Sequence, residues 1–198
     1  MKKYYILIFL FFAGLISSAI NPHDYFTWIL EVFPAIIGFA VLAFTFKRFK
    51  FTTLTYAAIL FHCYVLFVGG HYTYAQVPLF NWVRDVFHQS RNNYDKLGHF
   101  IQGFVPAMIT REIFIRQNVI QKKNWVPVLT VTVCMGISML YEFLEWFVAI
   151  TSGQSGDSFL GTQGDIWDTQ SDMLFATVGA IAMVTLLSKI QDKAITEN

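Results

Sequence analysis

Long apolar runs constrain the fold of this chain more than any other feature of its sequence. A helix needs about 20 mostly apolar residues to cross the hydrocarbon core of a bilayer. Six runs approach or reach that length: Tyr4–Ile20, Trp28–Phe46, Leu54–Gly70, His99–Ile115, Val126–Ile150 and Asp172–Ser188. Apolar residues make up 55% of the 198 residues, and the mean hydropathy of +0.48 exceeds what a water-soluble core requires. Because no internal repeat or low-complexity linker divides the chain, we predict an all-α, polytopic membrane bundle of about six transmembrane helices, forming one domain over residues 1–198.

Basic residues indicate how this bundle is oriented, because cytoplasmic loops of membrane proteins carry an excess of Lys and Arg. The basic residues that fall on one side are Lys2, Lys3, Lys47, Arg48, Lys50, Arg116, Lys122, Lys123, Lys189 and Lys193. We therefore expect both termini in the cytoplasm. The first run, with two lysines before it and Ser17-Ser18-Ala19 near its end, also has features of a signal peptide. It is long for a signal core, so we expect an uncleaved anchor.

Composition excludes some functions and leaves others open. The net charge is only +1 and no basic stripe exists, so we expect membrane lipid and not nucleic acid as a partner. Cys63 and Cys134 both lie inside apolar runs, where a small buried residue is the favoured interpretation. No G-x-S-x-G elbow, H-E-x-x-H motif or Walker A loop is present.

Polar residues at helical spacing gather at the expected outer ends of three runs. They are Asp95, His99 and Gln102 in the fourth run, Glu142 and Glu145 in the fifth, and Asp165, Asp168 and Asp172 in the sixth. Spacings of three and four place each set on one helix face. Glu142 lies about 12 Å inside the membrane at 1.5 Å per residue, where a carboxylate needs a partner. His71, after Gly69-Gly70, is expected to reach the same layer.

Carboxylates with a histidine are typical ligands of divalent metal ions. Our leading hypothesis is a divalent metal bound by His99, Glu142, Glu145 and Asp172. His99, Glu142 and Glu145 are the candidate catalytic residues, either through metal-activated water acting on an envelope or lipid-like substrate, or as general acid and base. The supporting or substrate-facing residues would be Asp95, Gln102, His71, Asp165 and Asp168.

Three other interpretations stay open. A metal-free sensor or ligand-binding protein needs only the outer site. A proton-coupled carrier is disfavoured, because we expect no matching set of polar groups at the inner side and find no inverted repeat. A purely structural network would use Asp165 and Asp168 as helix caps, with Lys96 neutralising one acid.

Near the inner side, two further features have structural interpretations. Glu112 and Arg116 are four apart, in the favourable order for an ion pair on one helix, and Arg111 is expected to extend to the inner headgroups. Gly179 and Ala180 are expected to permit close helix packing.

The second half of the chain resembles a known family. The matching segments are GGHYTYAQVPLFNW, YDKLGHFIQGFVPA, YEFLEW and DSFLGTQGDIWDTQSDM, in this order from Gly69 onward. They resemble the YjdF family of bacterial inner-membrane proteins, which implies a multi-pass protein of the bacterial inner membrane and no particular reaction.

A weaker similarity is to VanZ-like membrane proteins, and it implies cell-envelope or glycopeptide-related biology. Their characteristic positions would fall on Asp95, Lys96, His99, Phe100, Glu142 and Asp168. Glu145 and Asp172 stand where that family would be expected to carry amides.

Overall fold

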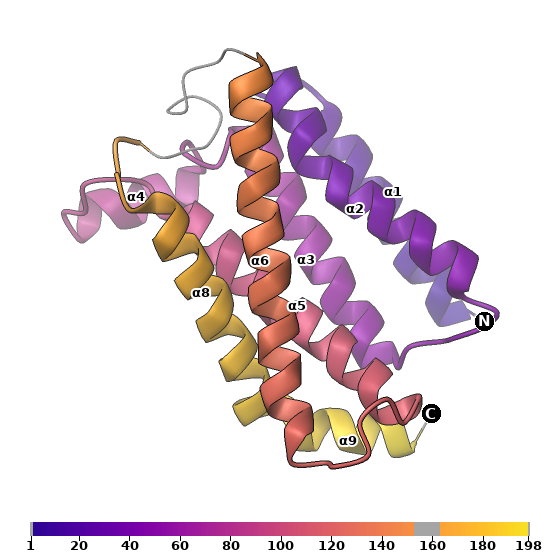
Figure 1. The fold of residues 1–198 in the computed structure, drawn as a ribbon. Helices are drawn as coiled ribbons and strands as arrows, with labels where there is room; N and C mark the ends of the chain where they lie inside the picture. Colours follow the sequence, from indigo (N-terminus) through magenta and orange to yellow (C-terminus); the bar gives the residue numbers. More distant parts are fainter. Residues whose placement is uncertain (1, 153–162, 198) are drawn as a thin grey trace. The chain divides into compact units, whose positions relative to one another are not determined.

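The structure, a computed structural model, describes residues 2–152 and 163–197, and all the regular secondary structure among them is helical. The elements are α1 (Lys2–Ala19), α2 (Tyr25–Thr45), α3 (Thr53–Tyr72), α4 (Pro78–Val86), α5 (Tyr94–Arg116), α6 (Trp125–Ser152), α8 (Asp168–Ala182), the π-helical turn η1 (Met183–Leu187) and α9 (Ser188–Thr196) (Figure 1). This confirms the all-α class. Residues 157–162 of the DSFLGTQGDIWDTQSDM segment lie outside the described residues.

Five helical segments among the described residues are long and apolar enough to cross a membrane. They are α1, α2, α3, residues 125–151 of α6, and the continuous helix from Asp168 to Thr196. The predicted fourth span corresponds to α5, whose 23 residues reach about 35 Å at 1.5 Å per residue. α5 is not among the five apolar segments because it contains several charged residues. Several of these charged residues are buried inside the protein rather than exposed to lipid.

One helix, α4, was not predicted, because its nine residues are too short to form a span and fell in an expected loop. Pro78 occupies its first turn, where the missing N–H of proline is not needed for an intrahelical bond. Leu79, Trp82 and Val86 project from it as exposed apolar side chains. Their spacing of three and four gives α4 an apolar stripe, as in helices that lie along a membrane surface.

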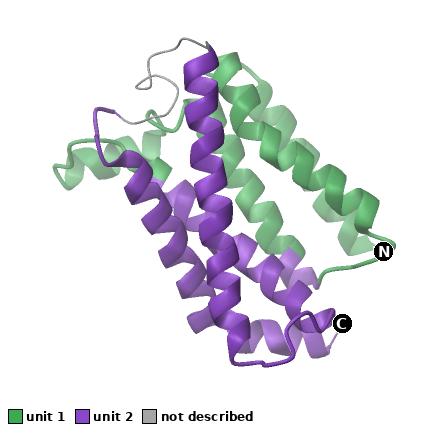
Figure 2. Ribbon diagram, in the orientation of Figure 1, with its two compact units in different colours: residues 1–51, 56–95 green, residues 52–55, 96–198 purple. Residues whose placement is uncertain are grey.

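The chain divides into two compact units (Figure 2). Unit 1 comprises residues 1–51 and 56–95, and unit 2 comprises residues 52–55 and 96–198. The core of unit 1 is apolar and consists of Phe11, Val32, Ala35, Cys63 and Phe67. Cys63 is therefore a small core residue, as predicted, and α1 contributes Phe11 to the same core.

The end of α1 is also held by polar contacts within unit 1. Trp28 donates its indole N–H to the Ser18 hydroxyl at 3.0 Å, and His71 Nδ1 lies 3.0 Å from the Ser18 carbonyl oxygen. A carbonyl oxygen only accepts, so Nδ1 of His71 carries the proton. His71 therefore serves as an anchor for α1 within its own unit.

In unit 2, α5 and α8 cross so closely that glycine is required at the contact. A Cβ atom built on Gly103 would overlap the carbonyl oxygen of Ala176, and one built on Gly179 would overlap the carbonyl oxygen of Phe100. Ala176 and Ala180 are fully buried in this contact region. The prediction of close packing at Gly179 and Ala180 is confirmed, and the crossing sets the distance between the side chains that α5 and α8 carry.

The other end of α5 carries buried charges. Glu112 is fully buried and accepts hydrogen bonds from the Thr52 backbone N–H and from Arg116 Nη1, both at 2.7 Å. The predicted pair of Glu112 and Arg116 is thus confirmed. The expectation for Arg111 was wrong: it is 7% exposed and donates to Gln191 Oε1 at 2.9 Å and to Asp192 Oδ1 at 2.6 Å. Partners on α9 make burial of its guanidinium possible.

Candidate functional site

The first turn and a half of α8 presents two carboxylates to a single ammonium group. Asp168 and Asp172 are four residues apart and are 5% and 3% exposed. Lys96 Nζ, from α5, lies 2.6 Å from Asp168 Oδ1 and 2.7 Å from Asp172 Oδ1. Lys96 is itself only 8% exposed, so all three charges are buried together. The expected neutralisation of one acid by Lys96 therefore extends to two.

His99 follows Lys96 by one helical turn and lies beside Asp172, one of the two carboxylates that contact Lys96. Its Nδ1 lies 2.8 Å from Gln102 Oε1, an oxygen that can only accept, so Nδ1 carries the proton. The other ring nitrogen, Nε2, lies 3.8 Å from Asp172 Oδ2. Asp172 thus directs one oxygen to Lys96 and the other to the Nε2 side of the imidazole.

The third helix, α6, adds Glu142 and Tyr141. Glu142 is 7% exposed and its Oε1 lies 3.8 Å from His99 Nδ1. The Tyr141 ring meets the His99 ring edge-on, with ring centres 6.2 Å apart. We name Lys96, His99, Gln102, Glu142, Asp168 and Asp172 the acid–histidine cluster.

The cluster has an excess of negative charge. Asp168, Asp172 and Glu142 supply three carboxylates, whereas Lys96 supplies one ammonium, so the sum is −2 when all are ionised and His99 is neutral. Buried charges in low dielectric interact strongly and require compensation. A cation, or protons taken up by the cluster, would lower the electrostatic cost of this arrangement.

The structure places the other predicted residues less centrally. Glu145 lies one turn after Glu142 on α6 and is half-buried. Asp165 is half-buried in the turn before α8, where its Oδ1 accepts the Trp167 backbone N–H at 2.9 Å. The expectation that Asp165 caps the helix was wrong, because the N-cap residue of α8 is Trp167 and this contact of Asp165 lies within the preceding turn. His71 has its contacts in unit 1, with Ser18.

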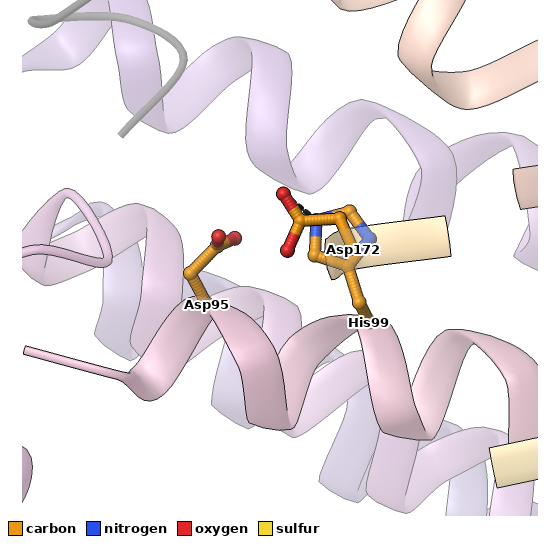
Figure 3. Close-up of side chains that lie close together, drawn as sticks. All are labelled: Asp95, His99 and Asp172. Carbon is orange, nitrogen blue, oxygen red and sulfur yellow. Dashed lines mark ion pairs between the residues drawn. The ribbon is translucent and has the colours of Figure 1, made fainter. Parts of the chain in front are cut away.

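Asp95 lies in the first turn of α5, four residues before His99. The boundary between the two units falls directly after it, and Arg91 Nη2 of unit 1 lies 3.7 Å from its Oδ2. One ligand atom each from Asp95, His99 and Asp172 lie within 4.8 Å of one another (Figure 3). This set shares His99 and Asp172 with the predicted ligands and has Asp95 in place of the two glutamates.

Sequence reasoning missed two features of the site. One is the position of Lys96 between two acids, which the Asp95-Lys96-x-x-His99 spacing could have suggested, since position 96 is one turn from position 99. The other is a buried hydroxyl, Ser138, four residues before Glu142 on the same face of α6. The sequence feature that could have indicated Ser138 is its spacing of four residues from Glu142 within an otherwise apolar segment.

The fold and the cluster together define a polytopic helical membrane protein with a buried acidic and histidine-containing site. The chain matches, over residues 3–193, the family described as "Predicted membrane protein (DUF2238)". It is 47% identical over 175 residues to the inner membrane protein YjdF of Escherichia coli (strain K12). The aligned residues cover 88% of this chain and 84% of the relative. The chain therefore belongs to this family, which confirms the resemblance and the multi-pass location in the bacterial inner membrane. No solved structure matches the chain.

Proposed function

We propose that the acid–histidine cluster binds a divalent metal ion between His99 Nε2 and Asp172 Oδ2. The observation that carries this proposal is the hydrogen bond from His99 Nδ1 to Gln102, which holds the ring so that its other nitrogen, Nε2, faces a carboxylate oxygen of Asp172. Metal-binding histidines commonly have their second ring nitrogen held in this way. His99 Nε2 and Asp172 Oδ2 lie 3.8 Å apart, and both are atoms that commonly bind divalent metal ions.

The spacing suits a small divalent ion. Zinc binds histidine nitrogen and carboxylate oxygen at about 2.0–2.2 Å, so one ion would bridge donor atoms 3.8 Å apart with a bent geometry. A ligand atom of Asp95 lies within 4.8 Å of those of His99 and Asp172, whereas Glu142 Oε1 lies 3.8 Å from Nδ1, the other nitrogen of the His99 ring. Lys96 would keep Asp168 as a charge partner, outside the set of ligands.

The proposal places this ion at the outer side of the membrane. The low number of Lys and Arg residues in the loops at that end supports this orientation. Glu145, one turn from Glu142, would lie beside the ion as a supporting acid rather than as a primary ligand. An ion in this position would polarise water or a headgroup oxygen of an envelope lipid.

The test compares two aspartates that both contact Lys96 but differ toward His99. Purified protein is loaded with Zn²⁺ or Mn²⁺, dialysed, and measured by elemental analysis beside Asp172→Asn and Asp168→Asn. We expect near-stoichiometric metal in the parent and in Asp168→Asn, and little in Asp172→Asn. A chelator should lower the melting temperature of the loaded parent alone, because metal bound only to the folded state stabilises it. A parent that retains no metal, or equal retention by the two variants, would sink the proposal.

A second function, a metal-free site that takes up a proton, is favoured by one observation. Lys96 already supplies a cation to Asp168 and Asp172, so a proton on His99 Nε2 would reduce the net charge of the cluster from −2 to −1 without a metal. Sensing or proton-coupled transport would use such a site. This second function is tested by the nuclear magnetic resonance titration of His99 in metal-free protein; a ring that remains neutral across the physiological range would exclude it.

A further inference from the structure

The buried face of α6 is a single stripe with an unusual composition. The buried residues of α6 occur at every fourth position and are Val126, Thr130, Cys134, Ser138 and Glu142. Residues four apart lie above one another on a helix, so these side chains form one row. Four of the five carry a hydroxyl, thiol or carboxyl group, whereas the rest of this membrane-spanning helix is largely apolar.

Two hydroxyls in this row make no hydrogen bond to the residues that the structure describes. They are Thr130 Oγ1 and Ser138 Oγ, in side chains that are 0% and 1% exposed. Other hydroxyls in the spans behave differently. Thr132, Thr177 and Thr185 each donate to the carbonyl oxygen four residues earlier, at 2.7–3.0 Å. A carbonyl oxygen four residues earlier is available to any hydroxyl inside a helix, but Thr130 and Ser138 do not bond to it.

Buried hydroxyls almost always have a partner, and in protein interiors this partner is often an ordered water molecule. We propose that ordered water occupies the buried face of α6 between Thr130 and Glu142, and that it forms a hydrated track leading from the acid–histidine cluster toward the Trp125 end of the helix. Thr130 and Glu142 are twelve positions apart, so the track spans about 18 Å along the helix. Its ligand is water, and through water it gives protons access to the cluster. The track does not depend on whether the cluster holds a metal ion.

The two cysteines of the chain provide a built-in comparison. Cys134 lies in the row between the two hydroxyls, whereas Cys63 lies in the apolar core of unit 1 with Phe11, Val32 and Phe67. Both thiols are buried, with exposed fractions of 1% and 7%. Burial alone therefore predicts that the thiol hydrogen of Cys134 exchanges with solvent more slowly than that of Cys63. The hydrated track predicts the opposite order.

The experiment measures exchange of the thiol hydrogen for deuterium by infrared spectroscopy, with the protein in lipid bilayers transferred to heavy water. Cys63→Ala isolates Cys134, and Cys134→Ala isolates Cys63. We expect Cys134 to exchange on the order of tenfold faster than Cys63. Subtracting the Cys134→Ala signal from that of the parent gives the Cys134 rate without use of the Cys63→Ala variant, should that variant not fold.

A third variant tests whether the exchange follows the row of hydroxyls. Ser138→Leu, made in the Cys63→Ala chain, fills the row and should slow Cys134 to the rate of Cys63. The matched control is Met139→Leu, one residue along the helix on the exposed side, which should leave the rate unchanged. Equal rates for Cys134 and Cys63 would overturn the proposal. So would fast exchange that Ser138→Leu does not slow, because general opening of the helix would then explain it.

Discussion

Lys96 is the residue on which the acid–histidine cluster most depends. Its ammonium group lies within 2.7 Å of carboxylate oxygens of both Asp168 and Asp172, and all three side chains are buried. Removing one partner of a buried ion network leaves uncompensated charge, which costs about 3–5 kcal/mol. We expect Lys96→Met to lower the free energy of unfolding by about this amount, measured as thermal stability in detergent.

Two further variants show whether the loss comes from buried charge. Adding Asp168→Asn to Lys96→Met removes one of the stranded carboxylates and should restore part of the stability. Lys193→Met is the matched control, because Lys193 and Glu197 form an exposed pair at 3.9 Å that contributes little. If Lys96→Met and Lys193→Met melted at the same temperature, the buried network would contribute nothing to folding.

Asp24 gives a prediction about pH in unit 1. It precedes α2, and its Oδ2 accepts the Thr27 backbone N–H at 2.7 Å, which holds the pKa of Asp24 below its ordinary value of 3.8. A lowered pKa in the folded state means that the stabilisation is present above pH 3.8 and is lost as the pH falls through the lowered value. Asp24→Ala should cost about 1 kcal/mol at neutral pH, and Asp24→Asn should cost much less.

The measurement is the melting temperature of the parent, Asp24→Ala and Asp24→Asn from neutral pH down to about pH 3. The advantage of the parent over Asp24→Ala should shrink in acid, whereas the advantage of Asp24→Asn should not depend on pH. An advantage of the parent that stayed constant in acid would show that ionisation of Asp24 has no part in capping α2.

Individual site residues were predictable where an acid or a histidine occurs in an apolar run. His99, Glu142 and Asp172 were named from the sequence because a charge in a membrane span requires a partner. Which atoms face one another was not predictable. The division of the Asp172 oxygens between Lys96 and His99 depends on helix rotation and on how closely α5 and α8 approach, and hydrophobic periodicity does not determine either quantity.

At the scale of elements, the crossing of α5 and α8 depends on two glycines. Gly103 and Gly179 each approach a backbone carbonyl oxygen of the other helix, so a methyl group has no space at either position. Gly103→Ala and Gly179→Ala should separate α5 from α8 and lower thermal stability. Both variants should also weaken ligand binding by the cluster, because His99 belongs to α5 and Asp172 belongs to α8. Differential scanning fluorimetry measures the first effect.

The matched control is a glycine of the same kind in open surroundings. Gly136, within α6, has no atom of the described residues within 4 Å of a built Cβ. Gly136→Ala should be neutral or should stabilise by about 0.5–1 kcal/mol, because alanine loses less backbone freedom in a helix. Equal destabilisation at Gly103, Gly179 and Gly136 would refute the argument from close approach.

The spans themselves were largely predictable, since apolar length determines them, and five of the six predicted runs correspond to apolar helices of the structure. The start of α5 at Tyr94 was set five residues too late, because charged residues in its first turn resemble a loop. The short helix α4 was missed for the reason given above. The π-helical turn left no signal, because one additional residue does not disturb an apolar pattern.

For the whole molecule, the orientation in the membrane stays a prediction. The distribution of Lys and Arg predicts that both termini are cytoplasmic. A fluorescent protein fused after residue 198 should therefore fold and fluoresce in cells, whereas alkaline phosphatase fused at the same position should be inactive. Active phosphatase at the C-terminus would reverse the orientation and place the acid–histidine cluster at the inner side.

The π-helical turn in the final helix has a consequence for comparing this chain with its relatives. Asp172, Ala176, Ala180 and Met183 are buried at intervals of three and four residues, but the next buried residue is Gln191, eight positions after Met183. A regular α-helix returns to the same face after about seven residues. The turn therefore acts as a one-residue insertion that keeps Gln191 in hydrogen-bonding distance of the Met108 carbonyl oxygen, while Ile190 stays exposed. A relative with an alignment gap of one position between Met183 and Leu187 would therefore have a regular α-helix here, and the two ends of its helix would still face the same neighbour.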